Sequence, residues 1–208
     1  MIQEGIVASI EKYGTPLFIF DVEKLYQRVN TIKKMTGTAI QLCYSIKANP
    51  FLIPAMLKVV DKLEVCSPGE LAICRTLGVD PQRIVYSGVN KTEIDIEDAI
   101  VYGVGIFTAE SLLHVKLINQ AALRHNVKVP LLMRLTAGNQ FGMSESDLLS
   151  VIENRTDYSG VDIKGIHYFV GTQRKKLQAQ KTELQKLREL YEKIKNVYNV
   201  TLDFLEYG

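Results

Sequence analysis

The 208-residue sequence contains no run of eighteen apolar residues, so no membrane-spanning helix is expected. Its first five residues, Met1 to Gly5, lack the basic region and apolar run of a secretory signal. The three cysteines are an odd number without CxxC spacing, which argues against a disulfide framework and against a zinc site. We therefore expect a reducing, cytoplasmic location and no bound metal.

Neither sign of charge is in excess, because 25 Lys and Arg face 23 Asp and Glu, for a net charge of +2. This balance gives no reason to expect a nucleic acid or an anionic membrane as a partner. The hydrophobic share of 47% and the charged share of 23% are those of an ordinary globular chain and exclude a disordered or collagen-like one. The length predicts one domain, or at most two small ones.

Short apolar segments alternate with longer amphipathic ones. The predicted strands are Leu17–Asp21, Gln41–Lys47, Leu63–Ser67, Arg83–Gly88, Ile106–Glu110, Leu131–Leu135, Gly165–Gly171 and Leu202–Tyr207. The clearest helical face comprises Leu177, Leu184, Leu187, Tyr191, Ile194 and Tyr198. Its heptad-like spacing also fits a coiled coil, but a single such segment between two strands favours a helix packed on a sheet.

The fold class predicted by this alternation is α/β, with a parallel sheet, because the strands are apolar on both faces and separated by helices. Seven or eight strand–helix repeats favour a (β/α)8 TIM-type barrel over an open doubly wound sheet. No glycine-rich dinucleotide fingerprint follows any strand, which weakens the open-sheet alternative further. No helix follows the last strand, so the barrel is expected to be truncated.

Functional residues of such a barrel lie at the carboxyl ends of its strands. The polar residues at these ends are Lys47, Glu64 with Ser67 and Glu70, Ser87, Glu110, Arg134, His167 and Glu206. Lys47 is either a solvated loop residue or a desolvated amine whose lowered pKa would permit covalent chemistry. Arg134 fits a structural ion pair and an anion or cofactor contact equally well.

Other residues near the strand ends have simpler interpretations. His167 and Phe169 are two residues apart and share one strand face, and Gly171-Thr172 offers N–H groups and a hydroxyl suited to a phosphate. Ser67, Pro68 and Glu70 have the spacing of a helix cap. Cys66 is interpreted as a small buried residue, and His114 and His125 as surface residues.

Together these segments resemble the fold-type III, alanine-racemase-like decarboxylases that use pyridoxal 5'-phosphate (PLP), which include the diaminopimelate, ornithine and arginine decarboxylases. The similar segments, in family order, are Tyr13–Asp21, Tyr44–Asn49, Leu63–Leu71, Tyr86–Lys91, Arg134-Leu135, Gln140–Met143 and Gly165–Gln173. The resemblance covers the whole chain, and these segments in order are far more specific than any one of them.

The resemblance implies a role for each matching residue. Lys47 would hold PLP covalently and act in catalysis, and the cofactor would accept the electrons left when carbon dioxide departs. The other residues implied to bind the cofactor are Glu64, Arg134, His167, Phe169, Gly171, Thr172 and Gly208. Residues 1–21 would carry a strand of a second, β-rich domain, and residues 22–208 would form an incomplete PLP-binding barrel.

Three departures from the family limit what the resemblance implies. Phe169 stands where the family usually has a second histidine, a change shared with a branch that decarboxylates a substrate tethered to a carrier protein. The stretch between Arg134 and Phe141 is shorter than in diaminopimelate decarboxylases. The chain also stops before the last barrel strand and the C-terminal β domain, so we expect little or no activity from these residues alone, and a homodimer for the full-length protein.

Two other functions remain open on the sequence. One is an amino-acid racemase of the same fold, and the other is a non-catalytic, single-barrel PLP homeostasis protein, or a catalytically dead relative. The Ser-Pro-Gly-Glu-Leu segment from Ser67 and the Gln-Phe-Gly segment from Gln140 favour the decarboxylase over the homeostasis protein. The substrate would in either enzyme be an amino acid.

Overall fold

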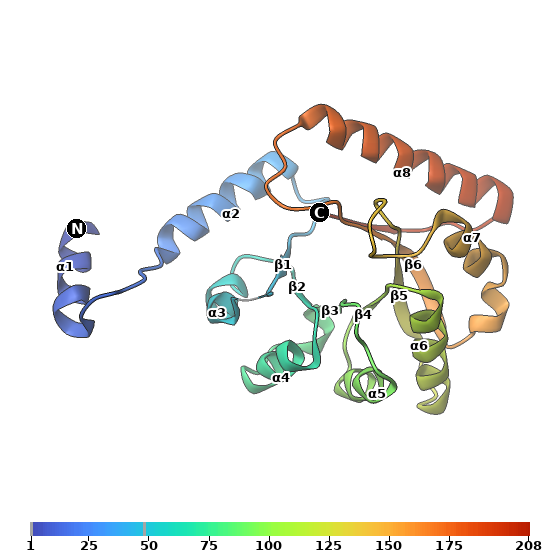
Figure 1. Cartoon of the computed structure of the whole chain (residues 1–208), viewed down its shortest axis with the longest axis horizontal. Helices are drawn as coiled ribbons and strands as arrows, with labels where there is room; N and C mark the ends of the chain where they lie inside the picture. The colour runs from blue at the N-terminus through green and yellow to red at the C-terminus, as the bar shows by residue number, and fades with distance from the viewer. Residues whose placement is uncertain (1, 48) are drawn as a thin grey trace.

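The computed structural model describes residues 2–47 and 49–208. Within this part of the chain, seven parallel strands form one curved sheet in the order β1-β2-β3-β4-β5-β6-β7 (Figure 1). The strands are β1 (Cys43–Ser45), β2 (Lys62–Val65), β3 (Ile84–Tyr86), β4 (Ile106–Ala109), β5 (Val129–Arg134), β6 (Val161–Tyr168) and β7 (Phe204–Tyr207). Strand order that follows chain order, with a helix between neighbours, is the topology of an incomplete TIM-type barrel and confirms the predicted fold class.

The described residues form eight helices, and those after the first lie around the outside of this sheet (Figure 1). The helices are α1 (Ile2–Tyr13), α2 (Val22–Thr36), α3 (Ile53–Met56), α4 (Pro68–Thr76), α5 (Glu93–Tyr102), α6 (Leu112–Arg124), α7 (Glu145–Glu153) and α8 (Leu177–Tyr198), with short 3-10 turns η1 (Pro50–Leu52), η2 (Pro81–Arg83) and η3 (Arg155–Tyr158). No helix in the described ranges combines the length and apolarity needed to span a bilayer.

One hydrophobic core joins the sheet to these helices. Phe107 of β4, Leu131 and Met133 of β5 and Ile166 of β6 are completely buried, and Ile118 of α6 packs into the same cluster. Each such side chain contributes about 1.5–3 kcal/mol when it leaves water. The core therefore fixes the strands whose carboxyl ends carry the polar residues.

The predicted cap at Ser67 is confirmed at the start of α4. The Ser67 hydroxyl accepts a hydrogen bond from the Glu70 N–H at 3.2 Å, and Pro68 occupies the first helical position. The Glu70 carboxylate accepts from the N–H of Cys66 at 2.7 Å, one residue before the cap. This contact holds the loop after β2 against the helix it leads into.

The long helix α8 matches the predicted segment, but its buried stripe is displaced. Leu187 and Ile194 are buried as predicted, and Leu190 is buried with them, whereas Leu177 and Leu184 are exposed. The helix packs along β6, β7 and α7 of its own chain, which excludes the coiled-coil alternative for this face.

Gly165 explains how β7 lies so close to β6. A Cβ atom at this position would meet the carbonyl oxygen of Phe204 at 1.7 Å, a distance that no side chain tolerates. The hydroxyl of Tyr191 accepts a hydrogen bond from the N–H of Ile166 at 3.1 Å and donates to the carbonyl of Phe204. Gly165 thus allows β7 to lie close to β6, and Tyr191 of α8 holds it there.

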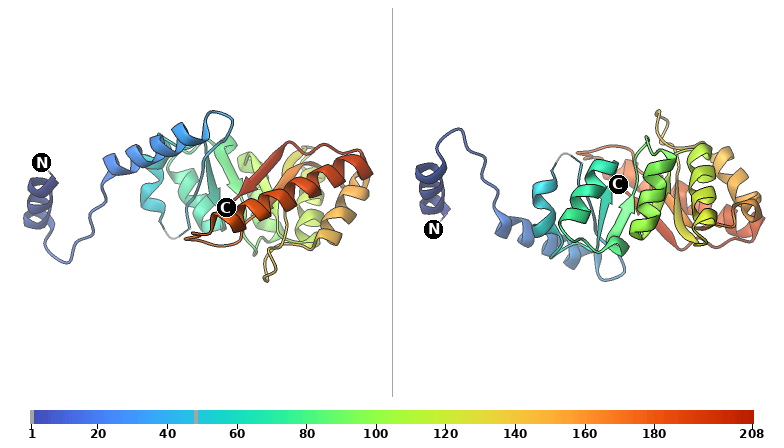
Figure 2. Two further views of the ribbon diagram at one scale, coloured as in Figure 1. Left: turned by 90° about the horizontal axis from the view of Figure 1, so that it is seen from above. Right: turned by 90° about the horizontal axis from the view of Figure 1, so that it is seen from below.

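The predicted strand at Leu17–Asp21 does not form among the described residues, because residues 17–21 pair with no described strand; their place in a second domain stays a prediction. Phe18 is fully exposed, and Ile19 and Phe20 are half exposed. Helix α1 and this extended segment stand away from the barrel (Figure 2). The apolar β-rich composition predicted a strand, but a strand needs a neighbour to pair with, and the segment lies too far from the sheet.

Candidate active site

The carboxyl ends of β5, β6 and β7 bring three predicted residues into one row. Arg134 pairs in register with His167, and His167 pairs in register with Glu206. Residues in register on neighbouring parallel strands point to the same face of a sheet. Glu110, directly after β4, extends the row to a fourth strand. Because successive side chains of a strand point to opposite faces, this register places a cation, an imidazole and two carboxylates together at one end of the barrel.

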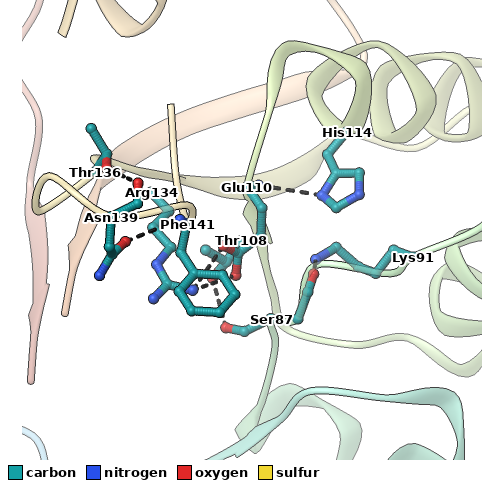
Figure 3. Close-up of polar contacts among 10 residues, drawn as sticks. Ser87, Lys91, Thr108, Glu110, His114, Arg134, Thr136, Asn139 and Phe141 are labelled. Carbon is teal, nitrogen blue, oxygen red and sulfur yellow. Dashed lines mark hydrogen bonds and ion pairs between the residues drawn. The ribbon is translucent and has the colours of Figure 1, made fainter. Parts of the chain in front are cut away.

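Arg134 forms a buried ion pair, which is the first of the two interpretations that the sequence left open. Its Nη1 atom lies 3.0 Å and 2.8 Å from the two carboxylate oxygens of Glu110, and Figure 3 shows the pair from the side. The guanidinium also lies 5.1 Å from the ring centroid of Phe141 and 6.0 Å from that of Phe169. An arginine oriented by a carboxylate and bordered by two aromatic rings is held in one position.

Lys47 follows β1 in a left-handed backbone conformation, with φ of 44°. A positive φ is unusual for a lysine, and its amine lies 5.2 Å from the Phe169 ring centroid. The side chain is exposed, so the desolvated amine envisaged from the sequence is not provided by the described residues. Lys47 and Arg134 nevertheless approach the same aromatic ring.

His167 is buried and neutral at pH 7. Burial lowers the pKa of its imidazole to about 4, against the opposing charge of Glu64. Its Nδ1 atom has no hydrogen-bond partner among the described residues. A buried ring nitrogen without a partner is rare in a folded protein and indicates a group that a ligand can satisfy.

Glu64 and Glu206 form a second, acidic part of the site. Burial, together with the nearby charge of Glu64, raises the pKa of Glu206 to about 7. The Oε2 atom of Glu206 has no partner among the described residues. Glu206 was noted at a strand end in the sequence but not assigned a role, and its burial could not be read from the sequence.

Lys91 and His114 are buried beside this row, and neither was selected from the sequence (Figure 3). The Lys91 amine donates to the carbonyl of Gly88, and burial lowers its pKa to about 8. The prediction that His114 lies on the surface is wrong: its Nδ1 accepts from the N–H of Glu110 at 3.3 Å. A turn of helix after Ser111 points the ring back to the strand end, which helical spacing alone does not reveal. His125 is exposed, as predicted.

Cys66 is half-buried, and burial raises the pKa of its thiol to about 12. At neutral pH it is therefore a thiol and not a nucleophile, in line with its interpretation as a small buried residue.

Ser87 has a structural role, because its hydroxyl donates to the Thr108 hydroxyl at 3.1 Å. Across residues 2–47 and 49–208, no cluster of three or more His, Cys, Asp or Glu has the geometry of a metal site.

Gly171, Thr172 and Gly208 lie on neighbouring segments. The N–H of Gly208 donates to the carbonyl of Tyr168 at 3.0 Å, and the N–H of Val170 donates to the carbonyl of Gly208 at 3.4 Å. Gly171 has φ of 154° and nothing within 4 Å of where a Cβ would stand. These two connections place the end of β7 beside the loop that follows β6.

The residues fit a planar, phosphorylated pyridine aldehyde. The exposed amine of Lys47, the flat ring of Phe169 and the partnerless nitrogen of His167 lie together. Open backbone at Gly171 offers room for a phosphate. Together they supply an amine to bind an aldehyde, a surface to stack a ring and N–H groups for an anion.

Comparison with known proteins agrees with this geometry. The family model described as pyridoxal-dependent decarboxylase, pyridoxal binding domain, matches residues 22–208. A diaminopimelate decarboxylase of Aquifex aeolicus (strain VF5) is 25% identical over 201 residues, covering 88% of this chain and 48% of that protein. The L-glutamyl-[BtrI acyl-carrier protein] decarboxylase of Niallia circulans is 29% identical over 187 residues, covering 82% and 44%.

A solved structure gives the same result for the fold. The lysine/ornithine decarboxylase of Vibrio vulnificus complexed with putrescine superimposes with a TM-score of 0.85 at 25% identity, covering 99% of this chain and 55% of that one. The chain belongs to the pyridoxal-dependent decarboxylases and comprises their pyridoxal-binding domain. It spans about half the length of the relatives it matches. The roles of the individual site residues remain predictions.

Proposed function

We propose that this chain is the cofactor-binding part of a PLP-dependent amino-acid decarboxylase in which Lys47 holds the cofactor. The observation that carries the proposal is the convergence of Lys47 and Arg134 on the ring of Phe169, with the unpartnered Nδ1 of buried His167 nearby. The family match over residues 22–208 supports the same cofactor. The racemase alternative shares this half of the site.

When bound, PLP supplies an electron sink for the carbanion formed on loss of carbon dioxide. The side chains of this chain would then bind and orient the cofactor. Lys47 provides the amine, and Phe169 provides a stacking surface that cannot transfer a proton. Neutral His167 offers a ring nitrogen to the cofactor, and Arg134, fixed by Glu110, keeps a positive charge beside it.

The backbone around Gly171, with the hydroxyl of Thr172 and with Gly208, would bind the phosphate of the cofactor. Glu64 would lie beside the cofactor ring, since its charge acts on both His167 and Glu206. A complete active site in this proposal includes residues outside this chain, and the complete protein would work as a homodimer.

For the substrate, we propose an amino acid attached to a carrier protein. The support is Phe169 in place of a histidine, the short stretch between Arg134 and Phe141, and the 29% identity to a relative named for an acyl-carrier substrate. Free diaminopimelate is the second candidate, supported by the relative from Aquifex aeolicus.

Reductive trapping tests the cofactor assignment. The chain is incubated with PLP, reduced with borohydride, digested and mapped by mass spectrometry. We expect the pyridoxyl label on Lys47 and its loss in Lys47→Ala. Lys91→Met is the matched control, because it removes a buried amine near the site and should leave the label in place. A label on Lys91 or on any other lysine in place of Lys47 contradicts the proposal.

Release of carbon dioxide by the complete protein tests the substrate. Diaminopimelate, free glutamate and glutamate attached to a carrier protein are compared under one condition. We expect release from the carrier-attached amino acid and little from the free ones. A product that keeps its carboxylate but has inverted configuration would instead identify a racemase. The 208-residue chain alone should show little or no release.

A further inference from the structure

Three side chains outside the proposed active site form a closed triangle of hydrogen bonds. Arg174 donates to the Tyr207 hydroxyl at 3.0 Å and to the Glu183 carboxylate at 2.5 Å, and the Tyr207 hydroxyl donates to the other Glu183 oxygen at 2.8 Å. The side chains of Arg174 and Glu183 are only 17% and 16% exposed. We call Arg174, Glu183 and Tyr207 the Arg174 clamp. Because each member is bound to the other two, their positions are mutually fixed.

The Arg174 clamp joins three separate parts of the chain. Arg174 lies in the loop between β6 and α8, Glu183 lies in α8, and Tyr207 is the last residue of β7. The ring of Tyr207 also stacks on that of Tyr168, with centroids 6.4 Å apart and planes 13° apart. The clamp therefore ties the loop after β6 to the end of β7, immediately before Gly208.

The loop held in this way has few contacts of its own. Among the described residues, the backbone N–H groups of residues 171–175 donate no hydrogen bond. Gly171 has φ of 154° and Gln173 has φ of 53°, so neither helix nor sheet geometry fixes the loop. Several free N–H groups in a turn of this kind are a suitable concave site for an anion, provided that something holds the turn in place.

We propose that the Arg174 clamp positions the N–H groups of Gly171 and Thr172 against Gly208, so that they form a preorganised site for the phosphate of PLP. This inference rests on the proposed function, since it assumes that PLP binds at Lys47. We assign Arg174 as a positioning residue and not a phosphate ligand, because both of its terminal nitrogens already donate within the clamp, to the Tyr207 hydroxyl and to the Glu183 carboxylate that offsets its charge. Preorganisation strengthens binding by removing the entropy cost of ordering the loop.

The test compares PLP with pyridoxal, which has the same ring and aldehyde but no phosphate. Dissociation constants are measured by absorbance titration for the full chain and for the variants Arg174→Met, Tyr207→Phe and Glu183→Gln. We expect each variant to weaken PLP binding by about tenfold and pyridoxal binding by less than about twofold, because the clamp acts on the phosphate site alone. Arg124→Met is the control, because Arg124 binds two carboxylates, Glu93 and Glu97, on helices away from the site.

The remaining outcomes separate this proposal from its alternatives. Equal losses for PLP and pyridoxal would mean that the clamp only supports the fold and would overturn it. A loss in Arg174→Met without a loss in Tyr207→Phe and Glu183→Gln would mean direct phosphate binding by Arg174, which also overturns it. A wild-type chain that binds PLP while all three variants bind it unchanged refutes the clamp alone. A wild-type chain that binds neither compound refutes the proposed function and the clamp with it.

Discussion

The ends of β4 and β5 differ from the strands around them in how their buried polar groups are satisfied. At the ends of β4 and β5, Glu110 and Arg134 are buried and bound to each other. Four other buried polar atoms have no partner among the described residues: the Ser45 hydroxyl on β1, the Tyr86 hydroxyl on β3, the Nδ1 atom of His167 on β6 and one oxygen of Glu206 on β7. Both regions belong to one sheet and one row of strand ends.

The paired residues carry opposite charges on adjacent strand ends, whereas the unpaired groups meet no complementary group among the described residues. Two of the unpaired groups lie on β1 and β7, which each have one strand neighbour in the described part of the chain. An unpaired buried polar group costs about 1–3 kcal/mol unless another group binds it. These unpaired groups are thus where ligand or further protein is most strongly required.

The largest expected effect is in the middle of the sheet. Glu110→Ala would leave the guanidinium of Arg134 without its carboxylate, and the two side chains are only 4% and 11% exposed. We expect the free energy of unfolding to fall by about 3 kcal/mol, as measured by urea denaturation.

The matched control removes an exposed ion pair of similar geometry. In Arg75–Asp98 the two side chains are 43% and 52% exposed and lie 2.8 Å apart. Asp98→Ala should cost less than about 1 kcal/mol, because water screens both charges. If both substitutions cost the same, burial at the middle strands does not control the strength of these pairs.

A smaller, pH-dependent effect is expected at the edge strand β7. The pKa of Glu206 is raised from 4.5 to about 7 by burial, with Glu64 adding to the shift and Cys43 and Arg134 opposing it. Between these two pH values the folded chain binds a proton that the unfolded chain has lost. The stability contributed by protonated Glu206 is therefore complete below pH 4.5 and is lost as the pH rises through 7.

Glu206→Gln keeps the shape of the neutral acid and cannot ionise. Since Glu206 retains some exposure to water, we expect the variant to be more stable than the wild type by about 1–3 kcal/mol at pH 8 and equally stable at pH 4. Thermal unfolding of both proteins at each pH measures the difference. The low pKa of His114, which lies away from Glu206, affects both proteins equally and cancels. A difference that does not change with pH contradicts this account.

Most of the fold was predictable because it depends on local patterns. Apolar runs such as Leu131-Leu132-Met133 and the periodicity of Leu177–Tyr198 identified β5 and α8 directly. The segment Leu17–Asp21 has the same apolar character, yet it forms no strand in this chain. A strand depends on a partner elsewhere, and a single segment does not reveal whether that partner is present.

The site was predictable only in part. Strand-end position correctly brought Arg134, His167 and Glu206 together, because register follows from the sheet. It did not identify Lys91 or His114, whose side chains reach the site from beyond the strands. The Arg174 clamp joins residues that are nine and twenty-four positions apart, a contact that depends on tertiary packing and has no local signal.

The smallest expected effect compares two serines that differ mainly in their place in the sheet. Ser87, after β3, donates to Thr108 at 3.1 Å, whereas the buried Ser45 hydroxyl on β1 has no described partner. Ser87→Ala should cost about 1 kcal/mol, because it removes a buried hydrogen bond and leaves the Thr108 hydroxyl unpaired. Ser45→Ala should be neutral or slightly stabilising, since it removes an unsatisfied polar group, and urea denaturation of the two variants side by side measures the difference. If Ser45→Ala costs as much as Ser87→Ala, the Ser45 hydroxyl is satisfied as well as that of Ser87, and the contrast between paired and unpaired polar groups fails at the level of a single hydroxyl.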